Sequence, residues 1–204
     1  MKGFYFITDS TLSRAGNLSD IKSALSAKVR VVQYRQKQKN TQEMFKEALR
    51  LRRLCKKTIF LVNDRVDIAL SVNADGVHLG QDDLPYAQAR RLLGKKKIIG
   101  ITVHDLAQAH HAQRQGADYI AVSPIFKTST KPDAGSAVGI ELIKKIKKRI
   151  PIPLVAIGGI NLFNAKEVIR AGADSICAIQ AVVTASDVRQ EIEKFQRLFN
   201  TKTA

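Results

Sequence analysis

Two cations alternate with polar side chains in the segment Gln33-Tyr34-Arg35-Gln36-Lys37. Because successive side chains of a strand point to opposite sides, Gln33, Arg35 and Lys37 share one side. Cations directed into an apolar core would be costly unless an anion met them. A solvated loop is the alternative, and it accounts for Lys37 but poorly for Arg35. The segment therefore predicts an anion-binding site.

Acidic side chains follow the next two apolar runs of the chain. Asp64 comes directly after the run that ends at Asn63, and Asp82 and Asp83 come shortly after the run that ends at Leu79. Two carboxylates beside a basic cluster suit a divalent cation that also binds the phosphate oxygens of a substrate. Capping of the following helices would suffice to explain any one of these residues. A metal–diphosphate site accounts for all of them together.

A second set of candidate residues lies in the later part of the sequence. Residues 123–135 are rich in hydroxyl groups and lysine, and a loop of this length is typical of an active-site lid or a phosphate-binding loop. Gly158 and Gly159 follow a later apolar run, and a helix is expected to begin after the run that ends at Ile179. Backbone N–H groups at these places form the usual phosphate site of a barrel.

The elements that must position these residues are short β-branched runs alternating with helical patterns, which is typical of a parallel α/β protein. Strands are predicted over residues 4–8, 29–35, 59–63, 76–79, 98–103, 119–122, 154–157 and 175–179. Eight strands with intervening helices predict a (β/α)8 TIM barrel, and the length of 204 residues predicts one domain over residues 1–204. Strand ends then meet at one mouth, with a metal-assisted and a metal-free anion site. These two anion sites suggest an enzyme that joins a diphosphate-bearing substrate to a monophosphate-bearing one.

Three similar segments each end a predicted helix and open a predicted strand: Asn73-Ala74-Asp75, Gly116-Ala117-Asp118 and Gly172-Ala173-Asp174. Glycine or asparagine can adopt the left-handed conformation that ends a helix. The aspartates precede strands, so they should lie at the amino-terminal end of the barrel, where residues serve stability. Asp75, Asp118 and Asp174 are therefore predicted to be structural.

The net charge of +16, from 34 Lys and Arg against 18 Asp and Glu, raises the question of a nucleic-acid partner. The cations cluster around residues 50–57, 95–97 and 144–149, late in predicted helices or just after them, where they suit the helix dipole. The chain has no Trp and no aromatic–basic alternation on which bases could stack. Nucleic-acid binding is not predicted as the main function, and a positive field that attracts anionic substrates accounts for the charge.

The cysteines and the apolar runs indicate in which cellular compartment the protein is expected. Cys55 and Cys177 lie in apolar segments without metal-ligand spacing, which predicts reduced core thiols. The first apolar run, closed by Asp9, is too short for a signal peptide, and no other run could span a bilayer. A cytoplasmic protein without a membrane partner is therefore expected. Of the histidines, His104 is expected near the mouth and His78 is expected to be a hydrogen-bonded core residue.

Several segments, in order over nearly the whole chain, resemble the family of thiamine-phosphate synthases and thiazole tautomerases. They are YFITD (5–9), VQYRQK (32–37), VNDRVDIAL (62–70), ADGVHLGQDD (74–83), DYIAVSPIF (118–126), TSTK (128–131) and VAIGGI (155–160). The resemblance implies condensation of hydroxymethylpyrimidine diphosphate with hydroxyethylthiazole phosphate, giving thiamine phosphate and pyrophosphate in thiamine biosynthesis. In that family the diphosphate leaves first and the thiazole nitrogen captures the pyrimidine methyl cation. Catalysis is then mainly electrostatic help to the leaving group, and positioning.

The resemblance also implies roles for individual residues, and small phosphorylated molecules as partners. The pyrimidine diphosphate would contact Gln33, Arg35, Lys37, Asn63, Thr102 and Lys131, of which Arg35, Lys37 and Lys131 would be catalytic. The Mg²⁺ cofactor would be held by Asp64 and Asp83. The thiazole phosphate would contact Thr128, Thr130, Gly159 and the backbone at Ile179 and Gln180. Assembly into a homo-oligomer is left open.

Four positions depart from the family pattern: Gln36 for glutamate, Thr102 for serine, Ser123 for glycine and Gln180 for a small residue. Gln36 is expected to point away from the site, and Thr102 keeps the hydroxyl. Gln180 could crowd the monophosphate, or turn outward and leave the backbone intact, which is the expected case. Thiazole tautomerases lose most diphosphate and metal residues and place a histidine where Ser123-Pro124 stands, so this chain matches the synthases. A tautomerase-type paralogue and a non-catalytic phosphate-binding or regulatory barrel are the alternatives.

Overall fold

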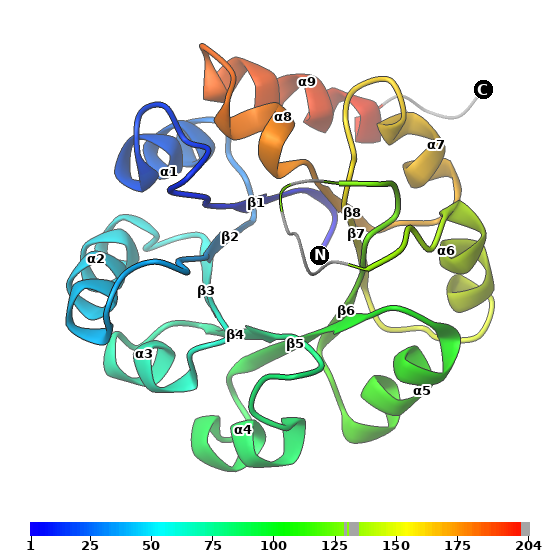
Figure 1. Cartoon of the computed structure of the whole chain (residues 1–204), viewed down its shortest axis with the longest axis horizontal. Coiled ribbons are helices and arrows are strands. Elements are labelled where there is room, and N and C mark those ends of the chain that lie inside the picture. Colours follow the sequence, from blue (N-terminus) through cyan, green and yellow to red (C-terminus); the bar gives the residue numbers. More distant parts are fainter. Residues whose placement is uncertain (129, 131–134, 201–204) are drawn as a thin grey trace.

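In the computed structural model, which describes residues 1–128, 130 and 135–200, eight parallel strands pair in sequence order and β1 also pairs with β8. The sheet thus closes into a barrel with helices around it (Figure 1). The strands are β1 (Gly3–Ile7), β2 (Val31–Tyr34), β3 (Ile59–Asn63), β4 (Gly76–Leu79), β5 (Ile98–Val103), β6 (Tyr119–Val122), β7 (Leu154–Ile157) and β8 (Ser175–Cys177). The predicted (β/α)8 barrel is confirmed, and β3 to β7 have the predicted bounds. The last strand is shorter than predicted because a helix begins at Ile179.

Helices follow the strands and form the outer layer of the molecule (Figure 1). They are α1 (Asn17–Ser26), α2 (Thr41–Leu54), α3 (Val66–Ser71), α4 (Tyr86–Leu93), α5 (Leu106–Gln115), α6 (Ile140–Lys147), α7 (Ala165–Arg170), α8 (Ile179–Val183) and α9 (Val188–Asn200). The start of α2 is well defined, because Asn40 and Glu43 each bond the backbone N–H of the other. None of the helices in the described residues is long and apolar enough to cross a membrane.

Alternating strand residues divide the buried side chains between two sides of the barrel wall. Tyr5 and Ile7 belong to an inner cluster with Cys177, whereas Phe4 and Phe6 pack in the larger cluster that includes the helices. Cys55 also lies in the larger cluster, and both thiols are free and buried, as predicted. Burial raises the pKa of the Cys55 thiol to about 11, so this thiol stays protonated at neutral pH.

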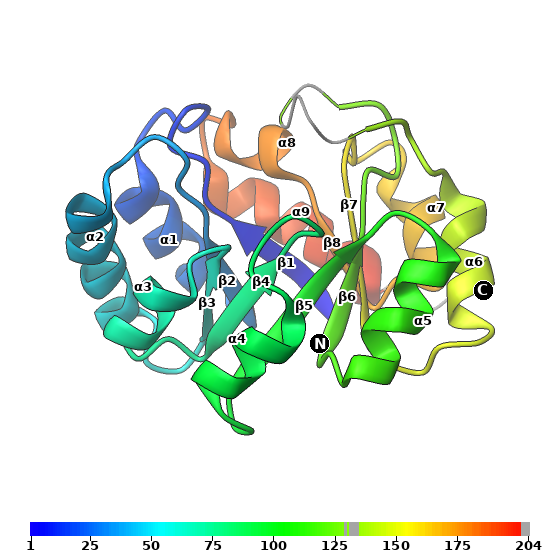
Figure 2. The ribbon, with the colours of Figure 1, turned by 60° about the horizontal axis from the view of Figure 1, so that its bottom comes forward.

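The three repeated aspartates bind the amino-terminal end of the barrel together. Asp75, Asp118 and Asp174 accept hydrogen bonds of 2.8 Å from the backbone N–H groups of Phe60, Ile99 and Leu154, respectively. Each carboxylate also pairs with a cation from the helix that precedes the bonded strand: Arg52 of α2, Arg90 of α4 and Lys147 of α6. This repeated arrangement confirms the predicted structural role. The opposite end of the barrel is left for function, and Figure 2 shows α8 at that end.

Candidate active site

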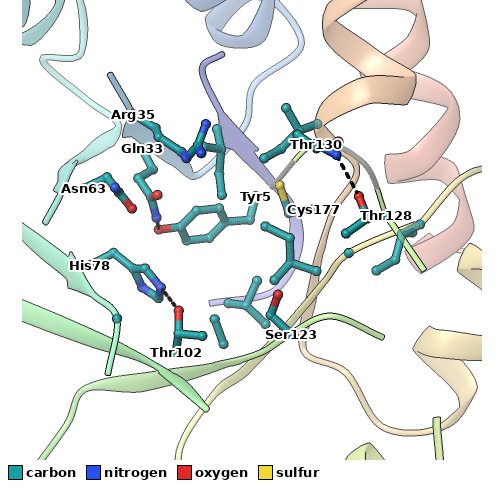
Figure 3. A pocket seen from close by; sticks show the side chains of 18 of the residues that line it. Tyr5, Gln33, Arg35, Asn63, His78, Thr102, Ser123, Thr128, Thr130 and Cys177 are labelled. Atoms are coloured by element: carbon teal, nitrogen blue, oxygen red, sulfur yellow. Dashed lines mark hydrogen bonds between the residues drawn. The ribbon is translucent and has the colours of Figure 1, made fainter. Parts of the chain in front are cut away.

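The carboxyl-terminal ends of the strands surround a cavity of about 630 Å³. All the predicted site residues that the structure describes line it: Gln33, Arg35, Lys37, Asn63, Asp64, Asp83, Thr102, Thr128, Thr130, Gly159, Ile179 and Gln180. Figure 3 shows Gln33, Arg35 and Asn63 on one side of the cavity and Thr128 and Thr130 on the other. Lys131 lies outside the described residues, so its predicted role stays a prediction.

Arg35 is held by a carboxylate that the sequence analysis did not select. Its Nη1 atom lies 2.8 Å from Oδ2 of Asp9, which is 4% exposed and lies two residues after the end of β1. The other oxygen of Asp9 accepts the backbone N–H groups of Thr11 and Leu12. The protein itself therefore supplies one anion to this arginine and fixes its orientation. The remaining N–H groups of the guanidinium are suited to a phosphate at the cavity wall. The signal for Asp9 was its place shortly after a strand, since it is the second residue after β1, as Asp64 is the first after β3.

Lys37 and Asp64 form a second ion pair at the mouth, with 2.5 Å between Nζ and Oδ2. The backbone of Asp64 has a φ of +63°, in the left-handed region that residues other than glycine rarely adopt. Strained backbone of this kind is concentrated at functional sites. Arg65 is the N-cap residue of α3, so the alternative that Asp64 serves as a helix cap is wrong.

Asp83 lies close enough to Asp64 for the two carboxylates to repel. Burial raises the pKa of the Asp83 carboxyl, and the neighbouring Asp64 raises it further, against the opposing effects of the Gly80 N–H group and Lys37. The Gly80 N–H donates to Oδ2 of Asp83 at 2.6 Å. Since Pro85 is the N-cap residue of α4, helix capping is wrong for Asp83 too.

The Asp64–Asp83 pair fits a divalent cation. Adjacent carboxylates are stable as a pair only when a proton or a cation compensates their charge. Among the described residues, no group of three or more acidic, histidine or cysteine side chains could hold a metal ion. Two carboxylates are nevertheless the usual protein contribution to a Mg²⁺ site, where water and substrate phosphate complete the coordination.

Glycine is required where the segments after β6 and β7 meet. Gly159 has a φ of +64°, and a Cβ atom there would lie 2.6 Å from the carbonyl oxygen of Lys127. The neighbouring Gly158 is as tightly packed, since a Cβ atom would lie 2.6 Å from Cα of Pro124. This close approach places backbone groups at the cavity surface next to Thr128.

The start of α8 completes this side of the cavity. Ile179 and Gln180 are its first residues, and N–H groups of a first helical turn have no partners within the helix. Thr130 contributes its backbone N–H, which donates to Oγ1 of Thr128 at 3.3 Å (Figure 3). Gln180 is exposed and is also one of the residues that line the cavity, so the expected outward orientation of its side chain stays a prediction. Backbone and hydroxyl groups here suit a monophosphate.

The structure also shows where Gln36, which departs from the family pattern, and the histidines lie relative to the cavity. Gln36 is buried away from the cavity and donates to Oγ of Ser10 at 3.0 Å, as expected. His104 lies at the mouth, and its Nδ1 is 2.6 Å from the carbonyl oxygen of Ser123. His78 is buried and hydrogen-bonded, as predicted, but it also lines the cavity.

The inner wall of the cavity includes two tyrosines that the sequence analysis missed. Tyr5 and Tyr119 are 2.8 Å apart through their hydroxyl oxygens, although 114 positions separate them in the sequence. Burial raises the pKa of both hydroxyls well above the usual range. Their only sequence signal was an inward-facing position in β1 and β6. Taken together, fold and mouth define a (β/α)8-barrel protein suited to bind phosphorylated small molecules.

Comparison with known proteins shows to which family of phosphate-binding barrels the chain belongs. The chain matches the family model for thiamine monophosphate synthase over residues 4–182. It is 52% identical over 193 residues to thiamine-phosphate synthase of Methanosarcina barkeri, covering 94% of this chain and 88% of that protein. It is 48% identical over 197 residues to thiamine-phosphate synthase of Chloroflexus aurantiacus, covering 95% and 91%. The solved structure of thiamine phosphate pyrophosphorylase from Pyrococcus furiosus is 38% identical, with a TM-score of 0.89 over 97% of this chain and 95% of that one. The chain belongs to the thiamine monophosphate synthase family.

Proposed function

We propose that this chain condenses hydroxymethylpyrimidine diphosphate with hydroxyethylthiazole phosphate to give thiamine phosphate and pyrophosphate, with Mg²⁺ as cofactor. One cavity combines a cationic and carboxylate set suited to a metal-bound diphosphate with a separate backbone and hydroxyl set suited to a monophosphate. This combination supports a transferase that brings two phosphorylated substrates together. The curated relatives carry the same activity in their names.

The diphosphate side of the site would assist the departure of the leaving group. Arg35, oriented by Asp9, and Lys37 would bind diphosphate oxygens, and Asn63 would contribute hydrogen bonds from the end of β3. Mg²⁺ bound at the Asp64–Asp83 pair would supply further positive charge to these oxygens. When the bond between the pyrimidine methylene carbon and oxygen breaks, the diphosphate keeps the electron pair. Cationic side chains are most valuable at that point, because charge then accumulates on the leaving oxygen.

The monophosphate side would position the second substrate. Thr128, Thr130 and the backbone at Gly159 and Gln180 would hold the phosphate of the thiazole. The thiazole nitrogen then donates its lone pair to the methylene carbon and forms the new C–N bond. No proton transfer is needed in this step, so anchoring both substrates in one cavity supplies much of the rate acceleration.

Four further statements accompany this proposal as predictions. Lys131 would contact the diphosphate and act in catalysis. The chain would function as a single domain over residues 1–204 and would act in the cytoplasm. Its partners would be the two small-molecule substrates rather than nucleic acid or a membrane.

The proposal is tested by incubating the purified protein with both substrates, with and without Mg²⁺, and measuring thiamine phosphate and pyrophosphate. Equal amounts of the two products are expected, and only when both substrates and Mg²⁺ are present. Each substrate alone serves as the control. Isomerisation of the thiazole phosphate without condensation would favour a tautomerase. Full activity after exhaustive chelation would remove Mg²⁺ from the proposal and leave the synthase activity standing.

A further inference from the structure

A chain of hydrogen bonds crosses the inner wall of the cavity, from β2 to β5. It links Gln33 to Tyr5 at 2.9 Å, Tyr5 to Tyr119 at 2.8 Å, Tyr119 to Nδ1 of His78 at 2.8 Å, and Nε2 of His78 to Thr102 at 2.8 Å. We call these five residues the polar chain. All of them line the cavity, and Figure 3 shows its two ends, Gln33 and Thr102, with Tyr5 and His78 between them.

The direction of each hydrogen bond in the polar chain follows from the bond that Gln33 makes at one end. Nε2 of Gln33 can only donate, so the hydroxyl of Tyr5 accepts that bond. Tyr5 is 2% exposed and Tyr119 is 1% exposed, and a buried hydroxyl hydrogen without an acceptor is costly. Among the described residues, Tyr119 is the partner left for the hydrogen of Tyr5. Tyr119 in turn donates to Nδ1 of His78.

This direction determines the tautomer of His78 and whether the Thr102 hydroxyl donates or accepts at the other end of the polar chain. Because Nδ1 of His78 accepts a hydrogen bond, the neutral ring carries its hydrogen on Nε2 and donates to Oγ1 of Thr102. The hydroxyl of Thr102, which accepts from the ring, then has its own hydrogen for a ligand in the cavity. Since burial keeps both tyrosines in the neutral form, the hydroxyl hydrogens that this order requires are present.

The two ends of the polar chain are therefore coupled. In this state Gln33 leaves its Oε1 atom to accept from a ligand, and Thr102 donates. If the Gln33 amide were turned over, Tyr5 would have to donate to it, and every later bond would reverse. Gln33 would then offer N–H groups, and Thr102 would offer a lone pair. With a neutral His78 ring, the cavity can present either pair of polarities but not a mixture without leaving a buried group unpaired.

We propose that the polar chain selects the amino-substituted pyrimidine of the substrate, with Tyr5, Tyr119 and His78 as positioning residues that hold Gln33 and Thr102 in matching states. This inference rests on the proposed function. The exocyclic amine of the thiamine pyrimidine donates hydrogen bonds and requires the Oε1 acceptor of Gln33. The anionic diphosphate accepts and requires the Thr102 donor. Both requirements are met by the same direction of the chain.

An analogue that carries a carbonyl oxygen in place of the amine would require the opposite state at Gln33. Reversal of the chain would then direct the lone pair of Thr102 towards the diphosphate. The oxo analogue is thus penalised at both ends. Sites built to hydrogen-bond a particular group reject analogues that cannot match it by large factors.

The test replaces Tyr119 by phenylalanine and compares binding of the amino and oxo pyrimidine diphosphates by calorimetry in the presence of Mg²⁺. Tyr119→Phe breaks the chain in the middle but keeps the ring, which packs against the Cβ-free backbone of Gly100. Tyr34→Phe is the matched control. Tyr34 is equally buried and lies in β2, but its hydroxyl donates to Glu47 at 2.6 Å outside the cavity. Thermal unfolding verifies that both variants are folded.

The wild-type protein and Tyr34→Phe are expected to prefer the amino compound by at least about a hundredfold. In Tyr119→Phe the preference should fall at least about tenfold, while Kd for the thiazole phosphate, measured by the same calorimetry, stays within about twofold. A wild-type protein without the preference, or Tyr119→Phe with the wild-type preference, would overturn the inference.

A second measurement reads the direction of the polar chain directly. In protein labelled with ¹⁵N-histidine, His78 is expected to be the Nε2–H tautomer, assigned by comparison with His78→Gln. Tyr119→Phe should shift the tautomer balance, and Tyr34→Phe should not. An Nδ1–H tautomer in the wild-type protein would refute the proposed direction. Binding and tautomer require no turnover, so these results can fail while the synthase activity stands, or stand while it fails.

Discussion

Asp83→Asn should make the protein more stable and less active at the same time. The substitution keeps an oxygen that can accept the Gly80 N–H, which now donates to Asp83 at 2.6 Å. It removes one of the two neighbouring negative charges, which belong to Asp64 and Asp83. In metal-free protein the repulsion should disappear, and with Mg²⁺ a ligand should be lost.

The direction of the stability change follows from the raised pKa of the Asp83 carboxyl. A carboxyl whose folded pKa lies above its unfolded value opposes folding when it is ionised. This cost is absent at a pH below the unfolded pKa and grows as the pH rises through the folded pKa. At pH 7, metal-free Asp83→Asn should therefore be stabilised by about 1 kcal/mol, the order expected for relief of one partly solvated like-charge contact. For a chain of this size that corresponds to a rise in Tm of about 2–4 °C.

Thermal unfolding with chelator and with Mg²⁺ separates the two effects. Free Mg²⁺ at about ten times its Kd should stabilise the wild-type protein by about 1.4 kcal/mol, and the variant by much less. The stability gain of the metal-free variant should vanish at pH 3, where the Asp83 carboxyl, whose pKa is raised in the folded protein, is protonated. Turnover with Mg²⁺ should fall at least about a hundredfold.

Two results would refute this reasoning. A metal-free variant less stable than the wild type at pH 7 would mean that Asp83 is compensated within the protein. Equal Mg²⁺ stabilisation of both proteins would place the ion elsewhere.

Three further predictions concern the rest of the mouth. Lys131→Ala should lower kcat at least about a hundredfold with little change in Tm, and near-normal turnover at saturating substrate would remove Lys131 from the mechanism. Gln180→Ser should change KM for the thiazole phosphate by less than about threefold, because Gln180 is exposed and its side chain is expected to point outward. An improvement of about tenfold or more in initial-rate measurements would indicate a different second substrate. Gly159→Ala should destabilise the protein by about 2 kcal/mol or more and raise KM for the thiazole phosphate, since its Cβ would meet the Lys127 carbonyl at 2.6 Å. Unchanged thermal unfolding would show that the loop can move aside.

The sequence alone determined the elements and the end of the barrel at which each residue lies. Strand and helix periods are local properties of the chain, which is why the bounds of β3 to β7 could be predicted. Parallel strands in a closed barrel all end at the same mouth. Position relative to a strand was therefore sufficient to separate Asp64 and Asp83 from the structural Asp75, Asp118 and Asp174.

Only the tertiary structure decided which of these residues meet. Asp9 reaches Arg35 because β1 and β2 pair in a particular register, and no local pattern specifies that contact. The left-handed turn at Asp64 brings its carboxylate to Lys37 and close to Asp83, and a composition rule cannot predict a strained residue. The bond between Tyr5 and Tyr119 needs the whole sheet to close and bring β1 and β6 face to face across the barrel. Periodicity gives the side of a strand that faces inward, but register and closure decide which inward-facing groups come within hydrogen-bond distance.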